Sequence, residues 1–116
     1  MCHVLIIEDE WLIAEYLLEL VSHAGATSVA TASTEQDAIS AARRQKPEII
    51  LSDVNLHIGT GPRAVQVIMA EAGAIPVIFI TGTPEDCHPC KTPAEILGKP
   101  IERQRVLEAF QRLAPI

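Results

Sequence analysis

Apolar residues follow two different periods along this chain. Five short runs are apolar throughout or nearly so, and longer segments between them place apolar residues three or four positions apart. A short continuous run predicts a buried strand, and the wider spacing predicts an amphipathic helix. The predicted strands span residues 3–7, 27–32, 48–52, 76–81 and 95–98, and the predicted helices span residues 10–23, 33–44, 62 onward and 101–113.

Signals at the helix ends support these assignments. Gly25 ends the first helix, and Pro62 stands at the start of the third. Ser33 and Gln36 have the spacing of a capping box. Three prolines and one glycine interrupt residues 82–93, so any helix there is short or irregular. The expected apolar stripes are, in chain order, Leu12, Ile13, Tyr16, Leu17, Leu20 and Val21; Ala38, Ile39 and Ala42; Val65, Ile68 and Met69; and Val106, Leu107, Phe110 and Leu113.

Strands and helices alternate from one end of the chain to the other. This order is typical of a parallel sheet that carries helices on both faces and is joined by right-handed crossovers. The strand at 27–32 is less apolar than the others, which favours a position near an edge. A length of 116 residues supplies one core but not two, so we predict a single domain over residues 1–116.

Composition excludes several classes of partner. The net charge of −6 argues against nucleic acid or an anionic membrane surface as the direct partner. No apolar run approaches the roughly 20 residues of a membrane span, and the first residues lack the pattern of a signal peptide. Three cysteines are an odd set, unlike a disulfide framework. We therefore expect a cytoplasmic domain with reduced cysteines.

Chemically active side chains gather where the predicted strands end. Glu8 and Asp9 follow the first strand, and Asp53 follows the third. Thr81 ends the fourth strand, and Lys99 follows the fifth. In an open parallel sheet the carboxyl ends of the strands share one edge, where ligands bind. We therefore predict that these acids, a hydroxyl and an amine converge in one cleft.

The three acids together predict a cation site. Two carboxylates about 4 Å apart repel by roughly 4 kcal/mol at an effective dielectric constant near 20, so a crowded set needs a cation or shifted pKa values. Hard oxygen donors suit Mg²⁺ or Ca²⁺ rather than zinc, and an open site with few protein ligands fits Mg²⁺ better. A single acid in this position is also an ordinary helix N-cap, a role open to Asp9 or Glu10.

A cation, an ammonium and a hydroxyl around one carboxylate are suited to phosphoryl transfer. Catalysis of that reaction is mostly positioning and electrostatic stabilisation of a charged phosphoryl group. A carboxylate can accept the group as an aspartyl phosphate. Asp53 is the best acceptor candidate because Glu8 and Asp9 are better used in holding metal. Lys99 and Thr81 are each expected to contact a phosphate oxygen.

With these residues in this order, the chain resembles a response-regulator receiver domain over its whole length. The resemblance rests on Glu8-Asp9, Asp53, Thr81 and Lys99-Pro100. It implies a flavodoxin-like (βα)5 fold with strand order 2-1-3-4-5. It also implies Mg²⁺ bound by Asp9, Asp53 and the backbone carbonyl of Asn55, with Glu8 acting through water, and a cis peptide between Lys99 and Pro100.

The resemblance also implies a signalling role in a two-component phosphorelay. A sensor histidine kinase or a histidine phosphotransfer protein would donate a phosphoryl group to Asp53, and the domain would then change a protein–protein interaction. The domain would catalyse its own phosphorylation and dephosphorylation without being an enzyme in the ordinary sense. We expect no output domain after Leu113, so the signal leaves through the face formed by residues 84–113, through a phosphorylation-dependent homodimer, or ends here as a phosphate sink. The segment Phe79-Ile80-Thr81-Gly82 resembles receivers of alphaproteobacterial general-stress signalling.

Four positions bear on how the receiver pattern works here. Receivers often carry an aromatic residue three positions before the lysine, and here that position is Ile96. Gly82 should loosen the loop after Thr81, so the output motion is expected to rest on Thr81 and that loop. Asn55 and Thr83 occupy positions at which receivers tune loss of the phosphoryl group.

Other interpretations remain open at this point. Cys87 and Cys90 form a Cys-x-x-Cys pair whose roles are an ordinary loop, a redox pair or half of a metal site. The whole chain could also be a pseudo-receiver that signals without phosphorylation. An aspartyl-phosphate phosphohydrolase would need an Asp-x-Asp-x-Thr motif, which residues 53–57 lack, and a flavodoxin-like carrier would need a phosphate cradle after the first strand. Trp11 either packs beside the acids or is partly exposed, and His57 is either an exposed loop residue or a kinase contact.

Overall fold

A computed structural model describes residues 2–83 and 94–115 of the chain. The described elements follow in the order β1 (His3–Ile7), α1 (Trp11–His23), β2 (Ser28–Ala32), α2 (Glu35–Arg44), β3 (Ile49–Ser52), α3 (Gly61–Ala72), β4 (Val77–Thr81), β5 (Ala94–Gly98) and α4 (Arg103–Leu113). All strand pairs are parallel, and the sheet order is β2-β1-β3-β4-β5. This is the predicted 2-1-3-4-5 order, with β2 at an edge as its weaker apolar pattern indicates.

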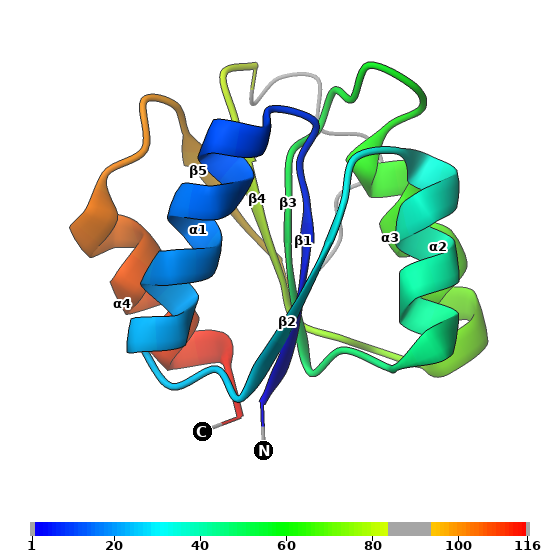
Figure 1. Cartoon of the computed structure of the whole chain (residues 1–116), viewed down its shortest axis with the longest axis horizontal. Coiled ribbons are helices and arrows are strands. Elements are labelled where there is room, and N and C mark those ends of the chain that lie inside the picture. Colours follow the sequence, from blue (N-terminus) through cyan, green and yellow to red (C-terminus); the bar gives the residue numbers. More distant parts are fainter. Residues whose placement is uncertain (1, 84–93, 116) are drawn as a thin grey trace.

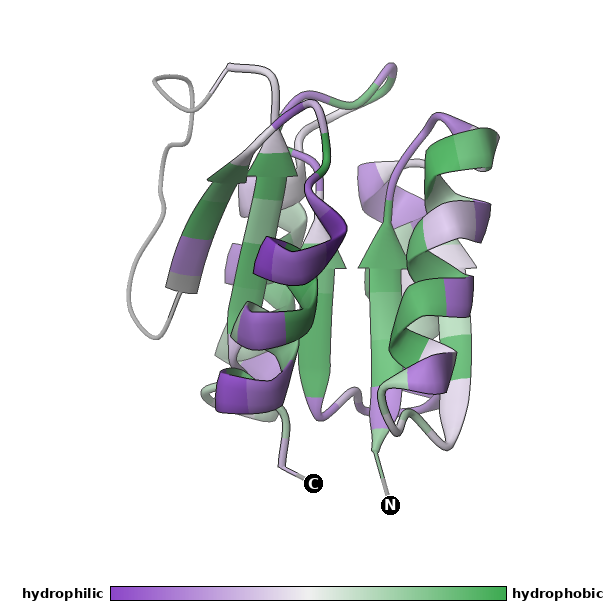
Figure 2. Cartoon of the chain, turned by 90° about the vertical axis from the view of Figure 1, so that its left-hand side faces the viewer, coloured by the Kyte–Doolittle hydropathy of each residue, from purple (hydrophilic) through white to green (hydrophobic). Residues whose placement is uncertain are grey.

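The sheet lies between two layers of helices (Figure 1), and an apolar cluster packs on each of its faces. Helices α1 and α4 cover one face and α2 and α3 cover the other. Alternate residues of the inner strands point to opposite layers, so Leu5 and Phe79 join one cluster while Ile6 and Ile80 join the other. Figure 2 shows the strands as mainly hydrophobic and the helices as hydrophobic on one side only. Burial on both faces explains why the central strands are continuously apolar rather than alternating.

The structure corrects two local predictions. Helix α2 is capped by Thr34, whose hydroxyl accepts a hydrogen bond from the Asp37 N–H at 3.0 Å, and not by Ser33. Both positions offer a hydroxyl, and the sequence alone does not choose between them. On α1 the buried residues are Ala14, Leu17, Leu20 and Val21, whereas Leu12 and Tyr16 of the expected stripe are exposed. The other stripes lie in the two cores, wholly or partly buried.

The fold places the carboxyl ends of the strands at one end of the molecule and both described chain ends at the other (Figure 1). Lys99 and Pro100 are joined by a cis peptide, as the resemblance implies. Cys87 and Cys90 lie outside the described residues. None of the described helices has the length and apolar character needed to cross a membrane.

Candidate functional site

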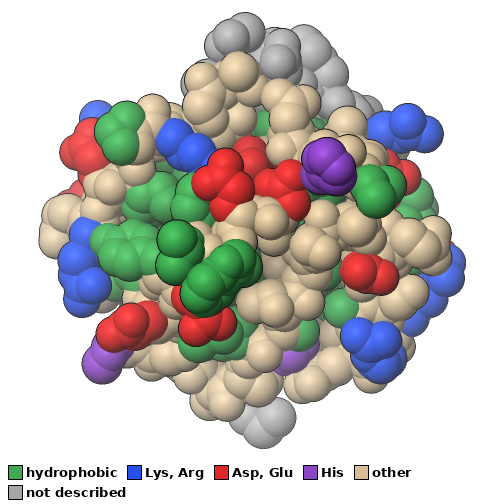
Figure 3. Space-filling view, turned by 45° about the horizontal axis from the view of Figure 1, so that its top comes forward, with side chains coloured by type: hydrophobic (Ala, Val, Ile, Leu, Met, Phe, Trp, Pro, Cys, Tyr) green, Lys and Arg blue, Asp and Glu red, His purple; other side chains and the backbone are tan. Residues whose placement is uncertain are grey.

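Four of the predicted site residues lie together above the carboxyl edge of the sheet. They are Glu8, Asp9, Asp53 and Lys99. Glu8 continues β1, where its N–H donates to the Ala32 carbonyl at 2.9 Å, and Asp53 continues β3, where its N–H donates to the Ile7 carbonyl at 2.8 Å. These backbone hydrogen bonds fix both acids relative to the sheet. Seen from this end, acidic side chains gather near the middle of the surface beside a basic side chain (Figure 3).

Asp53 is held at both oxygens of its carboxylate. Oδ1 accepts the N–H of Val54 at 2.7 Å, and Oδ2 lies 3.2 Å from the Nζ atom of Lys99. The side chain is buried, yet it lies at the end of a strand rather than inside a core. Lys99 reaches this point because β5 pairs with β4 in parallel. The N–H of Lys99 donates to the Thr81 carbonyl at 2.9 Å.

Lys99 also contacts the second buried acid, Glu8. Its Nζ atom lies 3.2 Å from Glu8 Oε1, so one ammonium bridges two carboxylates. Burial raises the pKa of Glu8 to about 7, and the nearby charge of Asp53 adds to the effect while the Glu10 N–H and Lys99 oppose it. Burial alone would lower the pKa of Lys99, but the two carboxylates more than offset it and the pKa is raised. The site therefore holds more negative charge than one lysine balances.

Asp9 completes a cluster of carboxylates. One oxygen atom each from Glu8, Asp9 and Asp53 lie within 4.8 Å of one another. Asp9 is half-buried, and its Oδ2 atom accepts the backbone N–H of His57 at 2.6 Å. Glu10 occupies the N-cap position of α1, but its side chain makes no capping hydrogen bond. Neither Asp9 nor Glu10 therefore acts as an ordinary helix cap. Oxygen donors at this spacing are suited to a hard divalent cation.

Thr81, Thr83 and Asn55 form a hydrogen-bonded chain beside this cluster. The Thr81 hydroxyl is buried, accepts the N–H of Thr83 at 3.0 Å and lies 3.3 Å from the Thr83 hydroxyl. Thr83 Oγ1 in turn accepts the side-chain N–H of Asn55 at 2.8 Å. These hydrogen bonds connect the loop after β3, which carries Asn55, with the loop after β4, which carries Thr83.

Two residues that the sequence did not single out support Asp53. The buried hydroxyl of Ser52 donates to the Asp53 carbonyl at 2.8 Å. Gly61, the first residue of α3, donates its N–H to the Val54 carbonyl at 2.9 Å and lies directly against the Asp53 backbone. The sequence signal for Gly61 is its place in Gly59-Thr60-Gly61-Pro62, but turn chemistry alone suggests conformational freedom rather than close contact.

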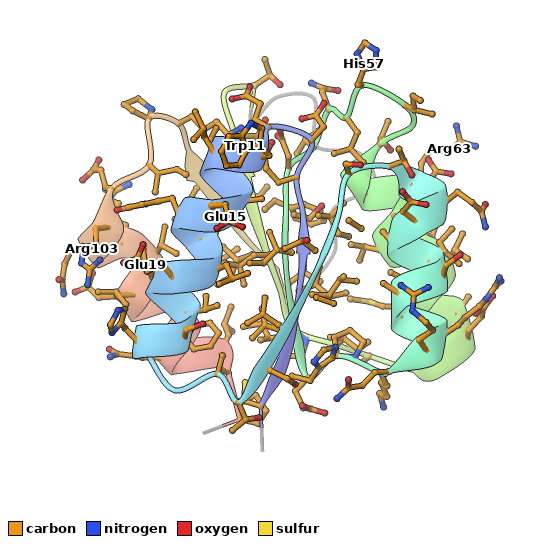
Figure 4. The ribbon with its side chains drawn as sticks, in the orientation of Figure 1. Trp11, Glu15, Glu19, His57, Arg63 and Arg103 are labelled. Carbon is orange, nitrogen blue, oxygen red and sulfur yellow. The ribbon has the colours of Figure 1, made fainter. Side chains whose placement is uncertain are left out.

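The two residues with open interpretations are both exposed. Trp11 has 71% of its surface exposed at the start of α1, although it lines a shallow pocket together with Glu8 and Asp9. His57 lies on the loop after β3, and Figure 4 shows its side chain pointing away from the molecule at the site end. Ile96, at the position where receivers often carry an aromatic residue, is 43% exposed on the edge strand β5.

Comparison with known proteins identifies the class that this fold and site define. Residues 4–111 match the response regulator receiver domain family, and the chain belongs to that family. It is 35% identical over 106 residues to the phyllosphere-induced regulator PhyR of Methylorubrum extorquens, covering 89% of this chain and 40% of PhyR. The chain is thus a receiver domain of two-component systems and is similar to the receiver of an alphaproteobacterial general-stress regulator.

Solved structures agree with the sequence comparison. The solution structure of the Erythrobacter litoralis PhyR receiver domain matches with a TM-score of 0.86 at 34% identity, over 97% of this chain and 88% of that one. The crystal structure of the anti-anti-sigma factor PhyR from Bartonella quintana matches with a TM-score of 0.79 at 33% identity, over 97% of this chain and 46% of that one. The chain spans only 23–40% of the length of the curated relatives that it matches.

Proposed function

We propose that this receiver takes a phosphoryl group onto Asp53 with the help of Mg²⁺. The observation that carries the proposal is the position of the Asp53 carboxylate, which lies beside the Lys99 ammonium and within a cluster of three acids. Lys99 neutralises charge on the incoming group, and the oxygen donors around it suit a divalent cation that would do the same. Catalysis by positioning and charge stabilisation needs no further group.

Each site residue has a distinct part in the proposed reaction. Asp53 is the nucleophile, so an oxygen of its carboxylate forms a bond to phosphorus as the bond from phosphorus to the donor breaks. Asp9, Asp53 and the backbone carbonyl of Asn55 would hold Mg²⁺, with Glu8 acting through water. The cation would supply charge neutralisation on the phosphoryl oxygens. Thr81 would turn its hydroxyl from Thr83 to a phosphoryl oxygen and so report the modification.

The proposal extends to the partners. The donor is a sensor histidine kinase or a histidine phosphotransfer protein, whose phosphohistidine nitrogen is the leaving group. The recipient of the signal is another protein, contacted through the face that includes β5 and α4. A second copy of this chain could be that protein, in which case the output is a phosphorylation-dependent homodimer. The likeness to PhyR, a protein described as an anti-anti-sigma factor, supports a protein target rather than DNA. We place this relay in the cytoplasm, with residues 1–116 acting as one receiver domain.

Intact mass spectrometry tests the acceptor. The protein is incubated with acetyl phosphate, with and without Mg²⁺, beside Asp53→Asn and the control Asp37→Asn, which changes an exposed aspartate on α2. One phosphoryl adduct that needs Mg²⁺, appears in the control and is lost in Asp53→Asn supports the proposal. An adduct that forms in Asp53→Asn at the same rate as in the wild-type protein would show that Asp53 is not the acceptor. No adduct and no beryllofluoride binding by the wild-type protein would identify a receiver that signals without phosphate.

A further inference from the structure

The Asp9 carboxylate accepts a hydrogen bond from a backbone N–H of the loop after β3. Glu8 and Asp53 are buried and each contacts Lys99, whereas Asp9 is half-buried and accepts the backbone N–H of His57. The distance of 2.6 Å from that nitrogen to Asp9 Oδ2 is shorter than an ordinary N–H···O bond, and hydrogen bonds to an ionised carboxylate are shorter than neutral ones. The donor belongs to the backbone, so its identity is independent of the side chain at position 57.

The loop that carries this N–H is held by hydrogen bonds to the start of α2. An isolated bridge joins Asn55 to Thr60 across the loop. The backbone N–H of Glu35, at the start of α2, donates to the Ile58 carbonyl at 3.3 Å, and the Glu35 carboxylate accepts the N–H of Thr60 at 3.1 Å. The His57 N–H is therefore held between the first turn of α2 and the acidic cluster. A rigid donor can orient a carboxylate, whereas a loose one would follow it.

We propose that His57 is a positioning residue whose backbone N–H orients Asp9 for the divalent cation. The inference rests on the proposed function, because it concerns the same cation site. A carboxylate has about four acceptor positions, so Asp9 can accept the N–H and still ligate a cation. Hydrogen bonds to ligating carboxylates fix their direction, and losing such a partner typically costs 10–100-fold in metal affinity. Every residue type except proline supplies this N–H.

Two substitutions at one position separate the N–H from the side chain. His57→Ala removes the exposed imidazole and keeps the donor, and His57→Pro removes the donor. Titration of the metal-free protein with Mg²⁺ by calorimetry should give an affinity within about twofold of wild type for His57→Ala, and a loss of about tenfold for His57→Pro. In an Asp9→Ala background, which has no carboxylate to orient, His57→Pro should add no further loss.

The outcomes distinguish this inference from the function on which it rests. If the wild-type protein binds no Mg²⁺, the proposed cation site itself fails. If the wild type binds Mg²⁺ but His57→Pro binds it equally well, or His57→Ala binds it as weakly as His57→Pro, the positioning role is wrong. Should His57→Pro fail to fold, hydrogen exchange decides. The His57 amide should be protected in the wild-type protein and lose that protection in Asp9→Ala, and equal exchange rates in the two would overturn the inference.

Discussion

Gly61 lies so close to Asp53 that no side chain fits between them. A methyl group at Gly61 would lie 1.8 Å from the Asp53 carbonyl oxygen and 2.2 Å from the Ser52 hydroxyl. The N–H of Gly61 also donates to the Val54 carbonyl, so the first turn of α3 rests directly on the end of β3. The close approach, and not an unusual backbone conformation, requires glycine here, because the φ of Gly61 lies outside the left-handed region.

Gly61→Ala should therefore displace the proposed acceptor. We expect the backbone at Asp53 to shift away from Lys99, slowing Mg²⁺-dependent phosphoryl uptake at least tenfold and destabilising the fold by about 1–3 kcal/mol, as is usual for overpacking. The measurements are adduct formation by intact mass and urea unfolding. Gly98→Ala is the matched control, because a methyl group at Gly98 meets nothing within 4 Å. Wild-type uptake by Gly61→Ala would show that the acceptor tolerates this shift.

Lys99→Ala should separate cation binding from phosphoryl transfer. The ammonium of Lys99 is the charge partner of both Glu8 and Asp53, but it is not an oxygen ligand. We expect the variant to bind Mg²⁺ at least as well as wild type, because more negative charge is left uncompensated, and to take up phosphoryl groups at least tenfold more slowly. Calorimetry and intact mass measure the two effects. Lys46→Ala, which removes an exposed lysine, should change neither, and loss of Mg²⁺ binding in Lys99→Ala would contradict the division of roles.

The sequence predicts the sheet and the strand-end acids because both follow from local patterns. Continuous apolar runs such as residues 49–51 are buried on both faces, and in a parallel sheet the carboxyl ends of the strands must share an edge. That geometry alone brings Glu8, Asp53 and Lys99 together. The same reasoning fails at the surface of α1, where Leu12 and Tyr16 fit the helical period but are exposed, since an apolar period does not say where the covered area ends.

Contacts between loops are the part of the site that the sequence could not predict. His57 and Asp9 are 48 residues apart, and their hydrogen bond uses a backbone N–H that every residue but proline carries. Ser52 and Gly61 likewise act on the backbone of Asp53, Ser52 through its hydroxyl and Gly61 through its lack of a side chain. Side-chain chemistry marks Asp9 and Asp53 in the sequence, but nothing in the residue types marks the backbone groups that support them.

Gly59 should tolerate alanine less well than Gly73. Both glycines have positive φ, of 84° and 90°, in regions where a side chain costs on the order of 1–3 kcal/mol. A methyl group at Gly59 would also lie 2.5 Å from the Cβ atom of Glu35, whereas at Gly73 it meets nothing within 4 Å. Gly73→Ala therefore measures the conformational cost alone, and urea unfolding should show a larger loss for Gly59→Ala. Equal losses would mean that the loop moves away from α2 without cost.

The loop that Gly59 shapes also presents the His57 N–H, so the same pair of variants tests a functional consequence. If the contact with Glu35 braces the loop, Gly59→Ala should weaken Mg²⁺ binding in calorimetry, and Gly73→Ala, at the far end of α3, should leave it unchanged. Weakened binding in both variants would point to a general loss of stability instead.

The buried carboxyl of Glu8 should make the metal-free protein less stable as the pH rises. Burial raises the pKa of Glu8 to about 7 in the folded chain from an ordinary value of 4.5, so between these values the folded protein binds more protons than the unfolded one. The contribution of Glu8 to the free energy of unfolding then falls as the pH rises from about 4.5 to 7 and levels off above that range. A tenfold change in an ionisation constant corresponds to about 1.4 kcal/mol, so the contribution is on the order of 1–3 kcal/mol.

Glu8→Gln isolates this contribution, because the amide keeps the shape of the side chain and does not titrate. Urea unfolding of both proteins in a chelator, at steps from pH 4.5 to 8, should show a steeper fall for the wild type than for Glu8→Gln. Mg²⁺ reverses the sign for the wild type, since a cation favours the ionised carboxylates, and its stabilising effect should increase as the pH rises through 7. Glu108→Gln, which changes an exposed residue of α4, should follow the wild type. Parallel curves for wild type and Glu8→Gln would mean that Glu8 ionises in the folded protein as it does in water.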